Sequence, residues 1–167
     1  MPFLMRHGFT TGNDRNNYGT PAFGSRDAVL LPMGIDQGRA AKDVFLNKYG
    51  IDTAEVKAAT STMPRTRETG LCAGFRFLTP YACLDEVRPE GSLEELRACL
   101  DRREVPKAAI QRAYQILRSP PLEDIWITHG VVMLGLCAVY GIERQPEQRF
   151  VPEFCEIIEL PSHSPGA

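Results

Sequence analysis

Several motifs that bind nucleotides or phosphate are missing from this sequence of 167 residues. None of the 14 glycines is followed by lysine, which excludes a P-loop ending in Gly-Lys. No two glycines stand as Gly-x-Gly, so a dinucleotide-binding fingerprint is excluded as well. No cysteine has an arginine six positions later, and no Asp-x-Asp occurs. The first absence excludes a phosphate loop around a cysteine nucleophile, and the second leaves an aspartyl-phosphate mechanism without an obvious position.

Clusters of metal ligands are also lacking. The only histidines are His7, His129 and His163, and there is no Cys-x-x-Cys pair. Zinc sites in proteins draw three or four ligands from such residues, so we expect neither a protein-bound metal nor another cofactor. The five cysteines cannot all pair with one another and follow no Cys-rich pattern. They are typical of reduced thiols in the cytoplasm.

Charge and hydropathy exclude two classes of partner. Lysine and arginine number 19 against 21 acidic residues, a net charge of −2, whereas nucleic-acid-binding domains are normally basic. Only five residues precede the charged Arg6, which leaves no room for a signal peptide. The longest apolar run, residues 125–142, is interrupted by Thr128, His129 and three glycines. A buried strand that continues into a buried helix explains this run better than a membrane span. We expect a cytoplasmic protein that binds neither nucleic acid nor membrane.

Strands and helices alternate along the chain, which predicts one layered α/β domain. Hydrophobic residues make up 43% of the sequence, enough for an independent core. We expect a single domain over residues 1–160 and a flexible tail over 161–167. A long loop over residues 9–31 separates the first strand from the first helix. The expected strands are Phe3–Met5, Val56–Ser61, Tyr81–Leu84, Ile125–Thr128 and Cys155–Leu160. The expected helices are Ile35–Tyr49, Pro64–Ala73, a segment from the Ser92/Glu95 capping box to about Leu100, Pro106–Leu117 and Val131–Tyr140.

Two histidines follow apolar strands directly. His7 stands in Phe-Leu-Met-Arg-His-Gly and His129 in Ile-Trp-Ile-Thr-His-Gly. Ligands of open α/β sheets bind at the carboxyl ends of the strands, so both imidazoles can reach one crevice. Two arginines point to the ligand: Arg6 beside the first histidine, and Arg65 at the start of a helix after a third strand. Guanidinium groups and helix N-termini both bind phosphate oxygens. The alternative is that each histidine is only a hydrogen-bonded residue at a strand end.

These residues resemble the motifs of the histidine phosphatase superfamily, which includes the cofactor-dependent phosphoglycerate mutases. The Arg-His-Gly hallmark, with Thr and Asn after it, is matched by residues 6–13. A Gly-x-x-Gln helix is matched loosely by Gly34 to Gln37. Residues 61–69 match Ser-x-x-x-Arg-Thr-x-x-Thr, residues 84–86 match Leu-x-Glu, and His129-Gly130 matches the second His-Gly. The resemblance implies a three-layer α/β/α sandwich with a mostly parallel central sheet, phosphoglycerate mutase-like, over residues 2 to about 160.

The resemblance also implies a role for each matched residue. His7 would attack as neutral imidazole and become phosphohistidine. Glu86 would be the general acid for the leaving oxygen and then the general base for water. The phosphate would be bound by Arg6, Asn13, Thr10, Arg65 and His129, of which His129 also counts as catalytic.

The sequence departs from the family pattern at two places. Phe9 stands where an acidic residue often follows Arg-His-Gly, so its ring lies at the pocket mouth or packs inward. The segment after Glu86 also lacks the usual glycine and aromatic residues, which leaves Asp85 and Glu90 as rival acids. For substrate selectivity, residues 14–30 hold four candidates. They are Arg15, Tyr18, Phe23 and Arg26.

The sequence therefore predicts a metal-independent phosphatase that hydrolyses a phosphomonoester, of a small metabolite or a phosphoprotein, through phosphohistidine. Only 42 residues separate Glu86 from His129. The mutases of the family carry a larger insertion there that encloses the substrate, whereas a short segment lets water reach the phosphoenzyme. The alternatives are a phosphoglycerate mutase-type transfer and a catalytically silent phosphate-binding relative.

Overall fold

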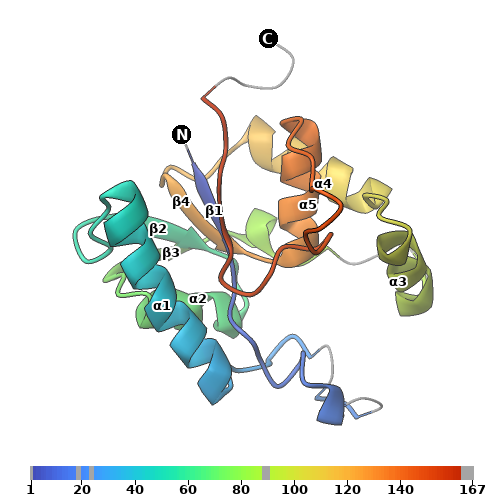
Figure 1. The fold of residues 1–167 in the computed structure, drawn as a ribbon, viewed down its shortest axis with the longest axis horizontal. Coiled ribbons are helices and arrows are strands. Elements are labelled where there is room, and N and C mark those ends of the chain that lie inside the picture. The colour runs from blue at the N-terminus through green and yellow to red at the C-terminus, as the bar shows by residue number, and fades with distance from the viewer. Residues whose placement is uncertain (1, 18–19, 23–24, 88–90, 163–167) are drawn as a thin grey trace.

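One mixed sheet forms the centre of the molecule, as seen in a computed structural model that describes residues 2–17, 20–22, 25–87 and 91–162. Within these residues the strand order is β3-β2-β4-β1-β5 (Figure 1). All neighbouring strands pair in parallel except β5, which is antiparallel to β1. The expectation of a mostly parallel sheet is confirmed. The strands are β1 Phe3–Arg6, β2 Lys57–Thr60, β3 Phe77–Pro80, β4 Ile125–Thr128 and β5 Ile157–Glu159.

Helices cover both faces of this sheet, as the three-layer prediction requires. Figure 1 shows α1 and α2 on one side, and α4 and α5 on the other. The helices of the described residues are α1 Pro32–Tyr49, α2 Pro64–Cys72, α3 Leu93–Asp101, α4 Lys107–Arg118 and α5 Gly130–Val139. Two short 3-10 helices are η1 Arg15–Asn17 and η2 Ala82–Leu84.

The strands supply both halves of the core because successive side chains point to opposite faces. Leu4 and Trp126 pack in one cluster with the apolar faces of α4 and α5. Met5 and Ile127 pack in the other with Phe45 of α1. Full burial of one such side chain contributes about 1.5–3 kcal/mol. A strand buried on both faces needs apolar residues at every position, which explains the continuous apolar runs that flag β1 and β4 in the sequence.

The third strand is the one element that the sequence prediction places wrongly. The segment Tyr81–Leu84 is not a strand: Ala82–Leu84 is η2, and the strand β3 precedes it at Phe77–Pro80. β3 lies at the edge of the sheet and Phe77 is 56% exposed, so it lacks the buried pattern that marks a strand. Leu84 is fully buried, which gives the following segment the apolar signal instead.

Other boundaries shift by one to three residues. Helix α1 begins at Pro32 because proline suits the first helical turn. It ends at Tyr49 and is capped by Gly50, whose φ of 67° favours glycine. The Ser92/Glu95 capping box is confirmed at the start of α3. Within the described residues no helix is both long and apolar enough to cross a membrane. The predicted tail, residues 161–167, lies mostly outside the described residues.

Candidate active site

The two histidines lie side by side because their strands are paired. Arg6 of β1 is in register with Thr128 of β4, and each histidine is the next residue along its strand. The backbone N–H of His7 donates to the carbonyl of Thr128 at 3.0 Å. The centroids of the His7 and His129 rings are 5.1 Å apart, and both side chains are buried. One phosphate can therefore contact both rings, as expected from adjacent strand ends.

Hydrogen bonds fix which ring nitrogen of His7 is free. Its Nδ1 lies 2.7 Å from the carbonyl oxygen of Gly8. A carbonyl only accepts, so Nδ1 carries the proton and Nε2 carries the lone pair. In His129 the Nε2 lies 2.9 Å from Oγ of Ser61, while the buried Nδ1 has no partner among the described residues. Each ring thus has one held nitrogen and one nitrogen available to a ligand.

Arg6 brings a guanidinium group to the same place. Its Nη1 donates to the carbonyl of Pro152 at 2.6 Å, and its guanidinium carbon lies 4.0 Å from the centroid of the Phe154 ring. A Cβ on Gly130 would lie 3.1 Å from Arg6 Nε, so the guanidinium packs against the backbone just after His129. The buried Nε has no partner within the described part of the chain.

Arg65 approaches from the first turn of α2. Its Nη1 donates to the carbonyls of Ser25 and Arg26, so it also ties the long loop to this helix. Thr69, one turn later, donates to the carbonyl of Arg65 at 2.7 Å and accepts the backbone N–H of Gly8 at 2.9 Å. The matched motif of residues 61–69 thereby holds the Arg-His-Gly turn in place.

Burial shifts the protonation of both histidines toward neutral imidazole. The pKa of His7 is well below its ordinary value of 6.5, because burial and then the charges of Arg6 and Arg65 disfavour the imidazolium. Burial and the nearby His7 and Arg65 lower the pKa of His129 in the same way. The pKa of Arg6 falls to about 10 on burial, so it stays charged at neutral pH.

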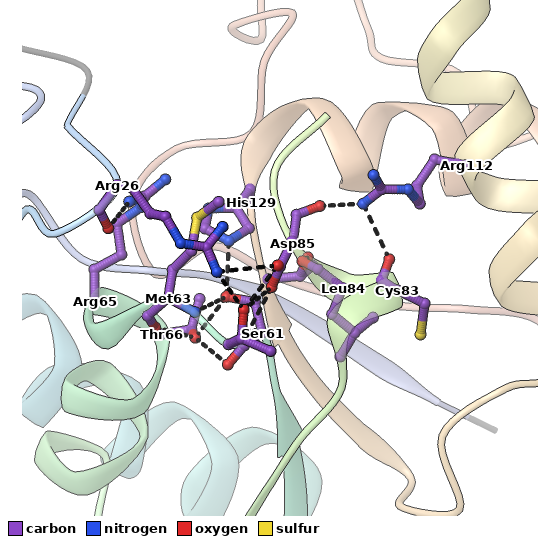
Figure 2. A network of polar contacts seen from close by, with 12 residues as sticks. Arg26, Ser61, Met63, Arg65, Thr66, Cys83, Leu84, Asp85, Arg112 and His129 are labelled. Carbon is purple, nitrogen blue, oxygen red and sulfur yellow. Dashed lines mark hydrogen bonds and ion pairs between the residues drawn. The ribbon is translucent and has the colours of Figure 1, made fainter. Parts of the chain in front are cut away.

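Glu86 follows the 3-10 helix η2, and this segment is held from two sides. Thr128 Oγ1 donates to the carbonyl of Leu84 at 2.7 Å. Arg112 Nη1 donates to the carbonyls of Cys83 and Asp85 (Figure 2). Burial raises the pKa of Glu86, and the N–H of Val87 and the charges of Arg6, Arg65 and Arg112 oppose that rise. A carboxyl that holds its proton to higher pH suits a general acid.

Asp85, a rival acid, is occupied by structural contacts. One of its oxygens accepts the backbone N–H of Thr62 at 2.7 Å, and both accept the Thr62 hydroxyl. Arg26 pairs with it at 3.5 Å. The Arg26–Asp85 pair is visible in Figure 2. Together with the Thr62 contacts it joins the long loop, the residues after β2 and the segment that carries Glu86. The other rival, Glu90, lies outside the described residues.

Thr10 and Asn13 are bonded to each other. The Thr10 hydroxyl donates to Oδ1 of Asn13 at 2.7 Å and accepts the N–H of Gly12. The hydroxyl proton of Thr10 is therefore used within the turn, in the bond to Asn13. Phosphate binding by Thr10 stays a prediction. The same bond leaves the amide NH₂ of Asn13 to serve as a donor, and its role in phosphate binding stays a prediction.

Phe9 packs beside the pocket rather than into the core. Its ring centroid lies 5.4 Å from that of Phe154, in edge-to-face geometry. Its backbone N–H donates to Oε1 of Gln37 at 2.9 Å. A Cβ on Gly34 would lie 2.2 Å from the carbonyl oxygen of Phe9. The loosely matched Gly-x-x-Gln segment thus places the first turn of α1 directly against the Arg-His-Gly turn.

The proposed selectivity residues are only partly accounted for. Arg15 is exposed in η1, and Arg26 bonds to Thr62 as well as to Asp85. Tyr18 and Phe23 lie outside the described residues, as does His163. In the parts of the chain that the structure covers, no three His, Cys, Asp or Glu residues gather as a metal site.

Three residues of the site are given no individual role by the sequence analysis. Ser61 begins the matched motif of residues 61–69 and follows β2 directly, and the structure shows that it contacts His129. Phe154 covers Arg6 from a loop before β5. Arg112 of α4 reaches the segment just before Glu86. Neither follows a local pattern, because both act through contacts between distant segments.

Comparisons with known proteins bear on the fold. No protein-family model matches the sequence, and no curated protein matches it. Solved structures do match. The protein TTHB049 from Thermus thermophilus superposes with a TM-score of 0.61 at 22% identity, over 91% of this chain and 88% of that one. A phosphoglycerate mutase from the same organism superposes with a TM-score of 0.61 at 22% identity, over 93% of this chain and 89% of that one.

A third similar structure is a candidate alpha-ribazole-5'-P phosphatase from Escherichia coli. It superposes with a TM-score of 0.55 at 18% identity, over 84% of this chain and 79% of that one. Similarity at this level of identity establishes the arrangement of elements, while chemistry has to be argued from the site. The chain therefore has a phosphoglycerate mutase-like fold, which is the fold that its motifs imply by resemblance.

Proposed function

We propose that the protein is a phosphatase that hydrolyses a phosphomonoester through a phosphohistidine on His7. The observation that carries this proposal is a pair of buried atoms, Arg6 Nε and His129 Nδ1, that have no hydrogen-bond partner among the described residues. They accompany the Nε2 of His7, whose other ring nitrogen is held by Gly8. A buried polar atom without a hydrogen bond costs about 1–3 kcal/mol. The oxygens of one phosphate supply acceptors for both groups while its phosphorus faces His7. The positive charges of Arg6 and Arg65 favour a dianion there.

In the first half-reaction, the Nε2 lone pair of His7 attacks phosphorus and the bond from phosphorus to the ester oxygen breaks. Glu86 gives its proton to that oxygen, and the alcohol leaves. The Nδ1–H of His7 stays bonded to the Gly8 carbonyl, which stabilises the positive charge that phosphorylation places on the ring. The arginines and His129 bind the equatorial oxygens, where negative charge is spread in the transition state.

In the second half-reaction, Glu86, now ionised, removes a proton from water as the water oxygen attacks phosphorus. The bond from phosphorus to Nε2 breaks, and His7 returns to neutral imidazole. Its lowered pKa favours that form, so each turnover leaves the nucleophile ready for the next. Inorganic phosphate then leaves the site.

One observation favours water over a second alcohol as the acceptor. The chain between Glu86 and His129 is short, and its described part consists mainly of α3 and α4. A mutase has to keep its phosphoenzyme from water, which calls for a larger enclosing segment. The solved structures similar to this chain carry both kinds of name, a mutase and a candidate phosphatase. We therefore expect release of inorganic phosphate, and isomerisation of a phosphoglycerate without that release would establish the mutase alternative.

The experiment is to trap the intermediate. The protein is mixed with nitrophenyl phosphate, quenched in alkali and digested, and the phosphorylated peptide is located by mass spectrometry. We expect phosphate on His7 that is lost in acid, no phosphoenzyme in His7→Gln, and turnover that a strong metal chelator leaves unchanged. Glutamine has no imidazole Nε2, so the variant removes the nucleophile with little change in polarity. Full turnover by His7→Gln, or phosphate on another residue, would overturn the proposal.

A further inference from the structure

A cavity adjoins the candidate active site. Its volume is about 320 Å³, and Glu86 lines it together with Arg26 and Arg112. That volume is at the lower end of the roughly 300–1,000 Å³ of small-molecule sites. The cavity, called here the leaving-group cleft, is thus continuous with the acid of the proposed reaction. Among the described residues, neither histidine lines it.

One wall of the leaving-group cleft is a single face of α4. Ala108, Gln111, Arg112 and Gln115 line it, at the spacing of residues that share one helix face. The two glutamines offer donors and acceptors, and the arginine offers a charge. A wall carried by a helix is held more firmly than one carried by the long loop of residues 9–31.

Arg112 forms no ion pair within the described residues, although its charge acts on Glu86 from a longer distance. Its Nη1 donates to two backbone carbonyls, and no carboxylate of the described chain forms an ion pair with it. Arg26, on the same cleft, is paired with Asp85 at 3.5 Å. A guanidinium group has five N–H donors, so the bonds of Nη1 leave others for a ligand. An anionic group would complete the contacts of Arg112.

The proposed reaction fixes which part of the substrate enters this cleft. Glu86 has to come within about 2.6–3.2 Å of the ester oxygen to protonate it. The alcohol joined to that oxygen then lies against Glu86 and extends into the space that Glu86 lines. We propose that the leaving-group cleft binds the alcohol part of the substrate and that Arg112 selects small alcohols carrying an anionic group. This inference rests on the proposed function.

The test measures binding apart from turnover. His7→Ala keeps the cleft and removes the nucleophile, so dissociation constants can be measured by calorimetry on intact esters. The probes are phosphoglycolate and 2-hydroxyethyl phosphate, which differ by a carboxylate in place of a hydroxymethyl group. We expect phosphoglycolate to bind about 10- to 100-fold more tightly, the effect of one charge-assisted hydrogen bond. Arg112→Gln in the same background should bring the ratio close to one.

Arg112 also holds the segment before Glu86, so replacing it could change binding by moving that segment. A second pair of variants tests the charge of the cleft without this effect. Gln115 lines the cleft without touching that segment in any described contact. Gln115→Lys should raise the preference for phosphoglycolate, and Gln115→Glu should lower it. Arg118→Gln removes a charge from the same helix outside the cleft and should leave the ratio unchanged.

The outcomes separate this inference from the proposed function. Equal binding of both esters, unaffected by the charge at residue 115, would overturn the inference even if His7 is phosphorylated. A preference that tracks the charges at residues 112 and 115 supports it. Loss of the phosphoenzyme with that preference intact would count against the proposed reaction and not against the cleft.

Discussion

At the residue scale, burial acts in opposite ways on the proposed nucleophile, His7, and the proposed acid, Glu86. A buried site disfavours the charged form of any group. For His7 the disfavoured form is the imidazolium, so its pKa falls and the ring remains a nucleophile. For Glu86 it is the carboxylate, so burial raises its pKa. The same burial thus shifts the pKa of the imidazole down and the pKa of the carboxyl group up, each in the direction that its proposed role requires.

The role of Glu86 can be tested through the leaving group. Glu86→Gln keeps the size of the side chain and removes its proton transfer, so turnover should fall about 10²–10⁴-fold with an alkyl phosphate. The loss should be much smaller with nitrophenyl phosphate, whose leaving group departs without a proton. Steady-state rates on the two substrates check this. Asp85→Asn is the neighbouring control, and equal losses on both substrates would mean that Glu86 is not the acid.

At the element scale, the site depends on a backbone contact between two turns. A Cβ on Gly8 would lie 2.6 Å from the Gly34 carbonyl oxygen, and a Cβ on Gly34 would be closer still to Phe9. The first turn of α1 and the Arg-His-Gly turn therefore touch through their main chains. Gln37, one turn further along α1, bonds to the Phe9 N–H and fixes the same contact.

Gly34→Ala should lower both stability and activity, because backbone rather than a flexible side chain would have to move. We expect a loss of about 1–3 kcal/mol, the usual range for overpacking, and reduced turnover in the protein that remains folded. Gly50→Ala at the other end of α1 is a matched control. It meets no atom within 4 Å but has a φ of 67°, so it should lower stability and leave turnover unchanged. Denaturant unfolding and steady-state rates would show whether the two variants differ in this way.

The buried strands could be predicted from the sequence, whereas the edge strand and two residues of the site could not. β1 and β4 stand out as buried apolar runs, and their ends give the positions of His7 and His129. β3 is missed because an edge strand buries little and carries no such pattern. Arg112 and Phe154 are missed for a different reason. They reach the site through contacts with residues far away in the chain, which no local spacing encodes.

At the scale of the whole molecule, the buried histidines link stability to pH. The pKa values of His7 and His129 in the folded protein lie below their ordinary value of 6.5, which applies to the unfolded chain. Below about pH 6.5 the unfolded chain takes up protons that the folded protein does not. Their contribution to stability is therefore fully present above this pH and is lost as the pH falls. Glu86, with its raised pKa, acts in the opposite direction as the pH rises above 4.5.

We expect the melting temperature to fall when the pH is lowered from 7 to 5, because two histidines outweigh one glutamate. Replacing both histidines, as His7→Gln with His129→Gln, should flatten this dependence. Calorimetry or circular dichroism across that pH range provides the measurement. If the double variant keeps the full slope, the dependence originates in other groups.

The pairing of β1 with β4 has a consequence for how the protein loses its activity. The amide hydrogen of His7 belongs to the same ladder of bonds that holds the central strands together. Such an amide exchanges with heavy water only when that ladder opens, and core strands open at the free energy of global unfolding. We therefore expect the His7–His129 arrangement to persist until the sheet itself unfolds. Heat inactivation should coincide with loss of the fold, and the His7 amide should be among the last in the chain to take up deuterium.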